Sequence, residues 1–312
     1  MFKYTLDNKR YHTLNYYYKN KYHEKVYKVS LNAGFTCPNI DGTKGYGGCI
    51  YCSKLGSGEH AGNTSDDLVT QFNKVKAVIS KKWDTNKYIA YFQARTNTYA
   101  PIAVLKEKYE TVLQIPGVIG LSIATRCDAI SDETLEYLKD LNKRTNLTIE
   151  LGLQTIHEKT SKLINRGHTL KEFDEMVKKL RNNNIDVVVH IINGLPYETK
   201  EMMLETIKHV NNLDIQGVKI HMLNIIKDTP LEKLYKKEKF HILEKEEYID
   251  IVISQLELLD EKIVIHRITS DPDIDTLIEP KWLIKKFIVL NDIDKEMKKR
   301  NTYQGRLAKE LE

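Results

Sequence analysis

The regular alternation of short apolar runs with longer segments of helical periodicity limits what this chain can fold into. Runs such as residues 88–93, 117–125 and 185–192 are apolar almost throughout, which is typical of strands that are buried on both faces. Between such runs, apolar residues recur at helical spacing, as Leu68 and Phe72 do. Strands that alternate with helices pair in parallel, so the sequence predicts a parallel sheet covered by helices.

The strand–helix unit repeats about six times after Lys25, which favours the α/β class and a partial (β/α)6 TIM-like barrel. In such a barrel the functional groups lie at the carboxyl ends of the strands. The first helix is expected to have Thr64 or Ser65 as its N-cap, and a later one Ser131. The expected strands are residues 25–30, 88–93, 117–125, 147–153, 185–192, 217–221 and 262–268, and the expected helices are 64–82, 101–113, 131–141, 158–165, 169–183, 199–213, 231–237, 244–259 and 280–289.

No change in composition along the chain indicates a second compact domain. We expect three parts instead. A basic, tyrosine-rich extension occupies residues 1–24, the barrel core occupies 25–270, and a basic helical extension occupies 271–312.

Positive charge gathers at the two ends of the chain. Residues 1–30 carry seven Lys or Arg against two acids and include seven tyrosines, and residues 281–312 carry nine Lys or Arg against five acids. Lysines interleaved with tyrosines suit phosphate contacts and base stacking, and this first segment could lie beside the barrel mouth. The alternative is that the tyrosines cap the barrel floor and the lysines only solubilise it. The candidate RNA-binding residues are Lys19, Lys21, Tyr17 and Tyr18, with Lys298, Lys299, Arg300 and Arg306 extending the same track.

The small number of cysteines bears on the compartment. Four cysteines in 312 residues argue for a reducing environment rather than a secreted disulfide scaffold. Residues 1–9 are polar and lack the apolar segment of a signal peptide, and no apolar run reaches membrane-spanning length. We therefore expect a cytoplasmic protein that does not associate with membranes.

Three of the four cysteines lie within residues 37–52, with the spacing C-x11-C-x2-C. The glycines of this stretch make a tight loop sterically feasible. A disulfide would leave one of the three unpaired, with Cys127 isolated. Two metal chemistries stay open: a zinc site completed by a histidine, and a [4Fe–4S] cluster with one iron open. The candidate ligands are Cys37, Cys49 and Cys52.

Polar residues recur within the expected strands or where they end. Each one alone is ordinary, but their recurrence at one end of successive strands is what a barrel active site requires. They include Gln93, Arg126, Glu150, His190, His221, His266 and Arg267.

Seven stretches carry a resemblance that covers nearly the whole chain: V-Y-K-V-S-L-N-A-G-F-T-C-P-N, Y-F-Q-A-R-T-N-T-Y-A-P, E-L-G-L-Q-T, L-I-N-R-G-H-T, H-I-I-N-G-L-P, V-K-I-H-M-L-N and V-I-H-R-I-T. They resemble the radical S-adenosylmethionine (SAM) superfamily, most closely its bacterial YtqA-like family, also called MnmL-like or YhcC-like. A more distant likeness is to the radical SAM domain of Elongator catalytic subunits. This chain is expected to be too short to carry their acetyltransferase domain as well.

The resemblance implies a partial barrel, a [4Fe–4S] cluster held by Cys37, Cys49 and Cys52, and SAM bound to the open iron. An electron from the cluster would cleave SAM into methionine and a 5′-deoxyadenosyl radical. The residues implied for SAM are Gln93 at the amine, Glu150 at the ribose, Arg166 at the carboxylate, and Gly194, Met222 and Leu223 near the adenine. The residues expected to face the substrate are Arg126, His190, His221, His266 and Arg267.

Two features depart from the superfamily pattern. The common spacing is C-x3-C-x2-C, whereas the first gap here is eleven residues, which lengthens the cluster loop. Cys127 lies in T-R-C-D where relatives are expected to read T-R-P-D-C. We therefore expect Cys127 to be a small strand-end residue rather than a radical quencher or substrate ligand.

The function implied by the resemblance is tRNA modification at the wobble uridine, from a carboxymethylaminomethyl side chain towards aminomethyl. The expected partners are tRNA and an electron donor such as flavodoxin or ferredoxin. Two alternatives stay open. One is a radical SAM enzyme that acts on a small metabolite or peptide, and the other is a non-catalytic metal-binding RNA adaptor.

Overall fold

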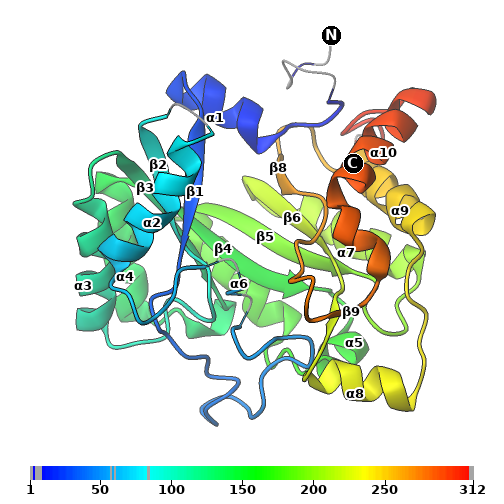
Figure 1. Ribbon diagram of the computed structural model, residues 1–312, viewed down its shortest axis with the longest axis horizontal. Coiled ribbons are helices and arrows are strands. Elements are labelled where there is room, and N and C mark those ends of the chain that lie inside the picture. Colours follow the sequence, from blue (N-terminus) through cyan, green and yellow to red (C-terminus); the bar gives the residue numbers. More distant parts are fainter. Residues whose placement is uncertain (1–2, 4–8, 57, 60, 83–84, 309–312) are drawn as a thin grey trace.

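The computed structural model describes residues 3, 9–56, 58–59, 61–82 and 85–308, and its centre is a curved sheet of seven parallel strands (Figure 1). The strands stand in the sheet in the order in which they follow along the chain, and each neighbouring pair is parallel. The predicted α/β partial barrel is therefore confirmed. The strands are β1 (Val26–Leu31), β2 (Lys87–Phe92), β3 (Val118–Thr125), β4 (Asn146–Gln154), β5 (Asp186–Asn193), β6 (Gly217–Met222) and β8 (Val264–Arg267).

Helices connect the strands and lie along the outside of the curved sheet (Figure 1). None of the helices in the described part of the chain is long and apolar enough to cross a membrane. The helices between and after the strands are α2 (Leu68–Ser80), α3 (Ile102–Leu113), α4 (Asp132–Arg144), α5 (Glu158–Leu163), α6 (Leu170–Arg181), α7 (Lys200–Asn211), α8 (Pro230–Lys237), α9 (Lys245–Leu258) and α10 (Lys286–Lys299).

The continuous apolar runs are buried on both faces of the sheet. Helices cover the outer face, and the curved sheet encloses the inner face. In β2, every residue after Lys87 is buried, and β5 buries most of its length. Leu105, Tyr109 and Val112 of α3 are fully buried against this layer. Each large apolar side chain buried in this way stabilises the fold by roughly 1.5–3 kcal/mol.

The helix caps decide where two of the helices begin. Ser131 caps α4, since its Oγ accepts from the Thr134 N–H at 3.1 Å, as predicted. The prediction of Thr64 or Ser65 as the cap of α2 is wrong. Asp67 caps that helix, because its carboxylate accepts from the Thr70 N–H at 2.9 Å.

The end of the chain differs from the expectation of one helix at 280–289. A 3-10 helix (Lys281–Lys285) leads into α10, which continues to Lys299. The helix extends because Val289, Ile293 and Met297 recur every four residues and are buried. Strands β7 (Ile225–Ile226) and β9 (Leu277–Glu279) form a small antiparallel pair that was too short to predict.

A helix that the sequence pattern did not indicate, α1 (Leu14–Tyr22), covers the barrel floor. Tyr18 is buried with Val26 and Ile89 beneath it. Figure 1 shows α1 at the top of the molecule and the cysteine-bearing segment after β1 at the bottom. A small cavity under the helix is lined by Tyr17, Tyr18 and Tyr22 together with Asn146, Asp186 and Val264, which begin β4, β5 and β8.

The expected position of this segment beside the barrel mouth is therefore wrong, because α1 packs at the amino ends of the strands. Tyr17 and Tyr18 face the floor, while Lys19 and Lys21 are exposed at the far end from the cysteines. Residues 1–2 and 4–8 of the predicted extension, and 309–312 of the C-terminal one, lie outside the described residues.

Replacing Tyr18 by Ala tests whether α1 is a structural floor. Removing a buried aromatic ring should lower the free energy of unfolding by about 3 kcal/mol, measured by urea denaturation. Lys19→Ala, on the exposed face of the same helix, should change it by less than about 0.5 kcal/mol. Equal effects of the two changes would mean that α1 does not seal the barrel.

Candidate active site

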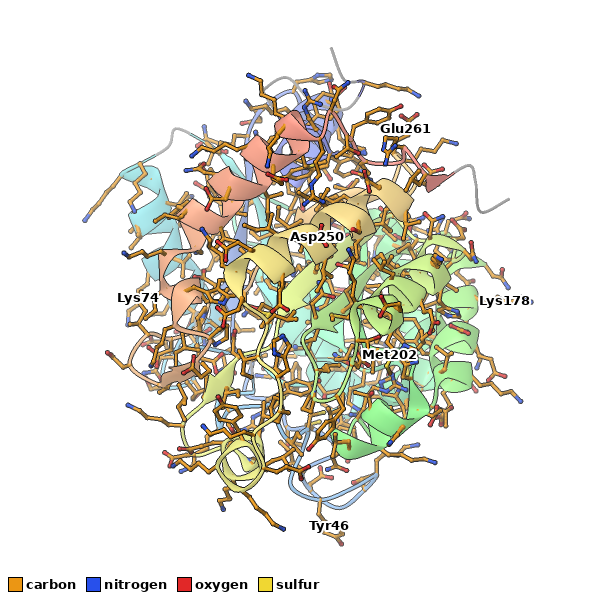
Figure 2. All side chains as sticks on the ribbon, turned by 90° about the vertical axis from the view of Figure 1, so that its right-hand side faces the viewer. Tyr46, Lys74, Lys178, Met202, Asp250 and Glu261 are labelled. Carbon is orange, nitrogen blue, oxygen red and sulfur yellow. The ribbon has the colours of Figure 1, made fainter. Side chains whose placement is uncertain are left out.

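The three clustered cysteines lie on the long segment that leaves the carboxyl end of β1 and leads to α2. This is the end of the sheet at which the sequence analysis predicts the functional groups. Tyr46, at the tip of this segment, is 80% exposed and points away from the body of the protein (Figure 2). We call residues 37–52 the cysteine loop.

The cysteine loop is folded by its own backbone hydrogen bonds. The Cys37 carbonyl accepts from the Ile40 N–H at 2.9 Å, and the Asn39 carbonyl accepts from the Gly48 N–H at 2.8 Å. The Cys49 carbonyl accepts from the Cys52 N–H at 3.0 Å, which is the tight turn expected between these two cysteines. Gly48 has φ +73°, a conformation that favours glycine.

Two asparagines clamp the loop to the turn that follows α5. The Asn39 Nδ2 donates to the Asn165 carbonyl at 2.6 Å, and the Asn165 Nδ2 donates to the Gly48 carbonyl at 2.7 Å and the Tyr46 carbonyl at 3.1 Å. A Cβ at Gly167 would lie 2.8 Å from the Asn39 Oδ1. The stretch L-I-N-R-G-H-T therefore serves as the platform on which the cysteine loop docks.

Charge and hydrogen bonding distinguish the thiols. A hydrogen bond with Cys52 lowers the pKa of Cys49 to about 6, and the nearby Arg126 acts in the same direction. The same bond and burial raise the pKa of Cys52. Arg126 is fixed by Asp128 through two hydrogen bonds of 2.9 Å, and it also donates to the Arg166 carbonyl at 2.7 Å. A fixed positive charge therefore stands beside the cysteines.

The donor set fits an iron–sulfur cluster in its chemistry, since three thiols on one loop are the ligands that such clusters take. Within the described part of the chain, no three His, Cys, Asp or Glu side chains are placed to hold a single metal ion.

The fourth cysteine differs from those of the loop in being fully buried. Cys127 opens the short 3-10 turn after β3 and is 1% exposed. Burial raises its pKa to about 12, so it remains a neutral thiol. It lies just past the end of β3, which fits the expectation of a small strand-end residue, and it is buried among core residues.

Glu150 lies at the centre of the barrel and is fully buried. Its carboxylate accepts from the Lys28 Nζ at 2.6 Å, the Ser122 Oγ at 2.6 Å and the His190 Nε2 at 2.7 Å. It also accepts from the Nζ of Lys219. Although burial opposes it, the charges of Lys219 and Lys28 hold the pKa of Glu150 well below its usual range.

The neighbours of this carboxylate are themselves perturbed. Burial lowers the pKa of Lys219 to about 7, against the attraction of Glu150. Burial and the charge of Lys219 lower the pKa of His190 to about 4, so this imidazole is neutral. The His190 and His221 rings lie 5.2 Å apart, which places two predicted substrate-facing residues side by side.

Arg166 is also buried, and its guanidinium is largely engaged by the backbone. It donates to the Leu153 carbonyl at 2.7 Å, to the Thr155 carbonyl at 2.6 Å, and twice to the His168 carbonyl at 2.9 and 3.1 Å. An arginine carries five N–H donors, so most of its capacity holds the turn after β4 to the loop after α5.

The residues expected near the adenine come together after β5 and β6. A Cβ built at Gly194 would lie 3.2 Å from the Met222 Cε, and Gly194 has φ +80°. The Leu223 N–H donates to the Asn193 carbonyl at 2.9 Å. Gln93 directly follows β2, and its N–H donates to the Leu31 carbonyl at 3.2 Å. His266 and Arg267 end β8.

Sequence reasoning missed Lys28, Lys219 and Ser122 around Glu150, and the two asparagines of the clamp. The lysines carried a signal, because each interrupts an otherwise apolar strand in K-V-Y-K-V-S and V-K-I-H. A buried lysine requires a partner, and Glu150 is one of the two acids within the expected strands, the other being Asp186. The asparagines carried no comparable signal.

Comparison with known proteins places the chain among relatives along its whole length. The sequence profile of the radical SAM superfamily matches residues 43–210, and that of the Radical_SAM C-terminal domain matches 215–299. The uncharacterised protein YtqA of Bacillus subtilis (strain 168) is 50% identical over 311 residues, which cover 100% of this chain and 97% of YtqA. Protein YhcC of Escherichia coli (strain K12) is 30% identical over 293 residues, 93% of each chain.

A shorter match links the chain to a second group. A tRNA uridine(34) acetyltransferase of Methanocaldococcus infernus is 26% identical over 156 residues, 49% of this chain and 29% of that protein. The structure of Methanocaldococcus infernus Elp3 with an N-terminal deletion has a TM-score of 0.68 at 18% identity, covering 89% of this chain and 64% of that one. This structural likeness shows a shared fold.

Replacing Asn165 by Gly tests the clamp. Glycine keeps the positive φ of 53° but removes two hydrogen bonds to the cysteine loop, worth roughly 2 kcal/mol together. In protein without metal, trypsin should then cleave after Lys44 up to about thirty times faster. Asn184→Gly is the matched control, since Asn184 has φ 55° and lies far from the loop along the chain. Unchanged cleavage in Asn165→Gly would mean that the clamp does not hold the loop.

Proposed function

This chain belongs to the radical SAM superfamily, and we propose that it uses a [4Fe–4S] cluster held by Cys37, Cys49 and Cys52 to cleave SAM reductively. The observation that carries this proposal is the cysteine loop, which is clamped at the carboxyl end of a parallel sheet where barrel enzymes keep their chemistry. When bound, the cluster supplies the electron that breaks a carbon–sulfur bond of SAM.

The residues of this chain would bind and orient the cofactors. Arg126 favours the thiolate form that cysteine needs as an iron ligand. The contact between Gly194 and Met222 gives a closely packed wall for the adenine, with Leu223 beside it. Gln93 would receive the methionine amine.

Two further roles in SAM binding would have to be shared with existing contacts. Arg166 has one N–H left for the methionine carboxylate beyond its four hydrogen bonds to the backbone. Glu150 would contact the ribose only by sharing a carboxylate that already accepts from two lysines, a serine and a histidine.

We further propose that the substrate is the wobble uridine of tRNA. Support comes from the partial match to the tRNA uridine(34) acetyltransferase, a relative whose name states that substrate. The exposed Tyr46 at the tip of the cysteine loop also offers an aromatic face on which a base can stack. Lys44 is exposed on the same loop and suits a phosphate.

The reaction that we propose converts a carboxymethylaminomethyl side chain to aminomethyl. Water is consumed, the carbon–nitrogen bond to the carboxymethyl group breaks, and that group leaves as glyoxylate, which is a two-electron oxidation. When bound, SAM would supply the oxidant: the two electrons and one proton would go to it, giving methionine and 5′-deoxyadenosine. A second proton goes to solvent. An electron donor such as flavodoxin or ferredoxin would reduce the cluster beforehand.

Substituting each cysteine tests the cluster assignment. Anaerobically reconstituted protein should bind about four irons. Cys37→Ala, Cys49→Ala and Cys52→Ala should each lose the iron and the visible absorbance of the cluster. Cys127→Ala should keep both, because that thiol is buried and neutral. Loss of the cluster in Cys127→Ala alone would overturn the ligand assignment.

Mass spectrometry of tRNA nucleosides tests the substrate. A strain that lacks this protein should accumulate the carboxymethylaminomethyl uridine and lose the aminomethyl form. The parent chain should restore the modification, and Cys49→Ala should not. Unchanged tRNA nucleosides, combined with SAM cleavage by the purified protein, would point to a small metabolite or peptide as the substrate.

A further inference from the structure

A cavity of about 370 Å³ lies at the open edge of the barrel, beside β8 and away from the cysteine loop in sequence. One wall is the end of β8 and the residues that follow it. The opposite walls are residues 11–15 and the start of α10. The lining residues that the argument uses are Tyr11, His266, Arg267, Thr269, Lys286 and Phe287.

Arg267 differs from the other cation of this cavity. Lys286 forms an ion pair of 2.6 Å with Asp271. Arg267 forms no ion pair or side-chain hydrogen bond with any residue that the structure describes, although it is at the edge of a polar interior. Arg267 is exposed, so the cavity carries an unpaired guanidinium that solvent can reach.

The strand register connects Arg267 to the barrel interior. A register shift between β6 and β8 pairs Lys219 with Arg267. The charge of Arg267 acts on Lys219 and on His221, lowering the pKa of both together with burial. The strand register therefore places Arg267, at the cavity, next to Lys219 of the buried network around Glu150.

That network has more positive than negative charge. Lys28 and Lys219 both pair with Glu150, which is the only carboxylate that either lysine contacts among the described residues. Lys219 has a pKa of about 7 and is therefore partly protonated at neutral pH. When it is protonated, two ammonium groups and one carboxylate leave one positive charge, and the exposed Arg267 adds a second at the cavity. An anion that enters here would be attracted by Arg267 and would favour the protonated form of Lys219.

Unpartnered polar atoms lie beside these charges. The His221 Nε2, the His266 Nδ1 and the Thr269 Oγ1 are buried and have no hydrogen-bond partner in the described part of the chain. Buried polar groups are nearly always satisfied, so the two of these residues that line the cavity indicate that something polar completes them. Thr269 and His266 also line the cavity.

We propose that Arg267, with Lys219 behind it, forms a binding site for an anionic oxygen group of the substrate, a carboxylate or a phosphate, that enters through this cavity. The exposed ring of Phe287 and the buried ring of Tyr11 give the same cavity an apolar side that suits the ring of a nucleoside. The proposal rests on the proposed function only for the source of the anion, which would be the modified uridine or its RNA backbone.

Thermal unfolding with simple anions tests the site without any RNA. At constant ionic strength, acetate and inorganic phosphate should raise the Tm of the parent chain above its value in chloride, because they bind the folded state. Arg267→Gln should lose this rise, and Arg267→Lys should keep part of it. Lys178→Gln, which removes an exposed charge in the last turn of α6, should behave like the parent. Equal shifts in the parent and in Arg267→Gln would overturn the proposal.

Anticodon stem–loops separate the two sources of the anion and the two proposals. If the site takes the carboxylate, Arg267→Gln should weaken binding of a carboxymethylaminomethyl stem–loop at least tenfold and leave that of its methyl ester unchanged. If it takes a phosphate, both affinities should fall alike and the salt slope should flatten by about one contact. Unaltered stem–loop binding in Arg267→Gln would overturn the substrate site. Anion-induced stabilisation without stem–loop binding by the parent would keep the anion site and reject tRNA.

Discussion

The ion pairs that Glu150 forms inside the barrel are the interaction on which the rest of the site depends. A fully buried carboxylate is stable only with charged partners, and here Lys28 comes from β1 and Lys219 from β6. Those strands are far apart in the sheet order, so the pairs span the curved sheet across its concave side. The same pairs place Lys219 next to Arg267 at the open edge of the sheet.

The two ends of the barrel are closed by different structures. One end stabilises the fold, and the other carries the cysteines. At the amino ends of the strands, α1 places tyrosines against Val26 and Ile89 and closes the floor. At the carboxyl ends, a long glycine-rich loop is held by side-chain amides rather than by an apolar core. A loop held in this way can hold three half-buried cysteines while its backbone stays fixed.

The sheet could be predicted from the sequence because buried parallel strands leave continuous apolar runs, and β2, β3 and β5 lie where those runs are. The cysteine ligands could be proposed from spacing alone. Helix α1 could not, because its tyrosines and lysines follow no apolar stripe. The Asn39–Asn165 clamp and the Lys28–Glu150–Lys219 pairs join residues more than sixty positions apart, so only the folded chain shows them.

The central claim is that this chain performs reductive cleavage of SAM at its cysteine loop. The most direct measurement is the amount of 5′-deoxyadenosine formed when the anaerobically reconstituted protein is mixed with SAM and dithionite. We expect 5′-deoxyadenosine and methionine in equal amounts, and neither from the Cys49→Ala chain. Protein that carries its full iron content, binds SAM and yet releases no 5′-deoxyadenosine under these conditions would contradict the account.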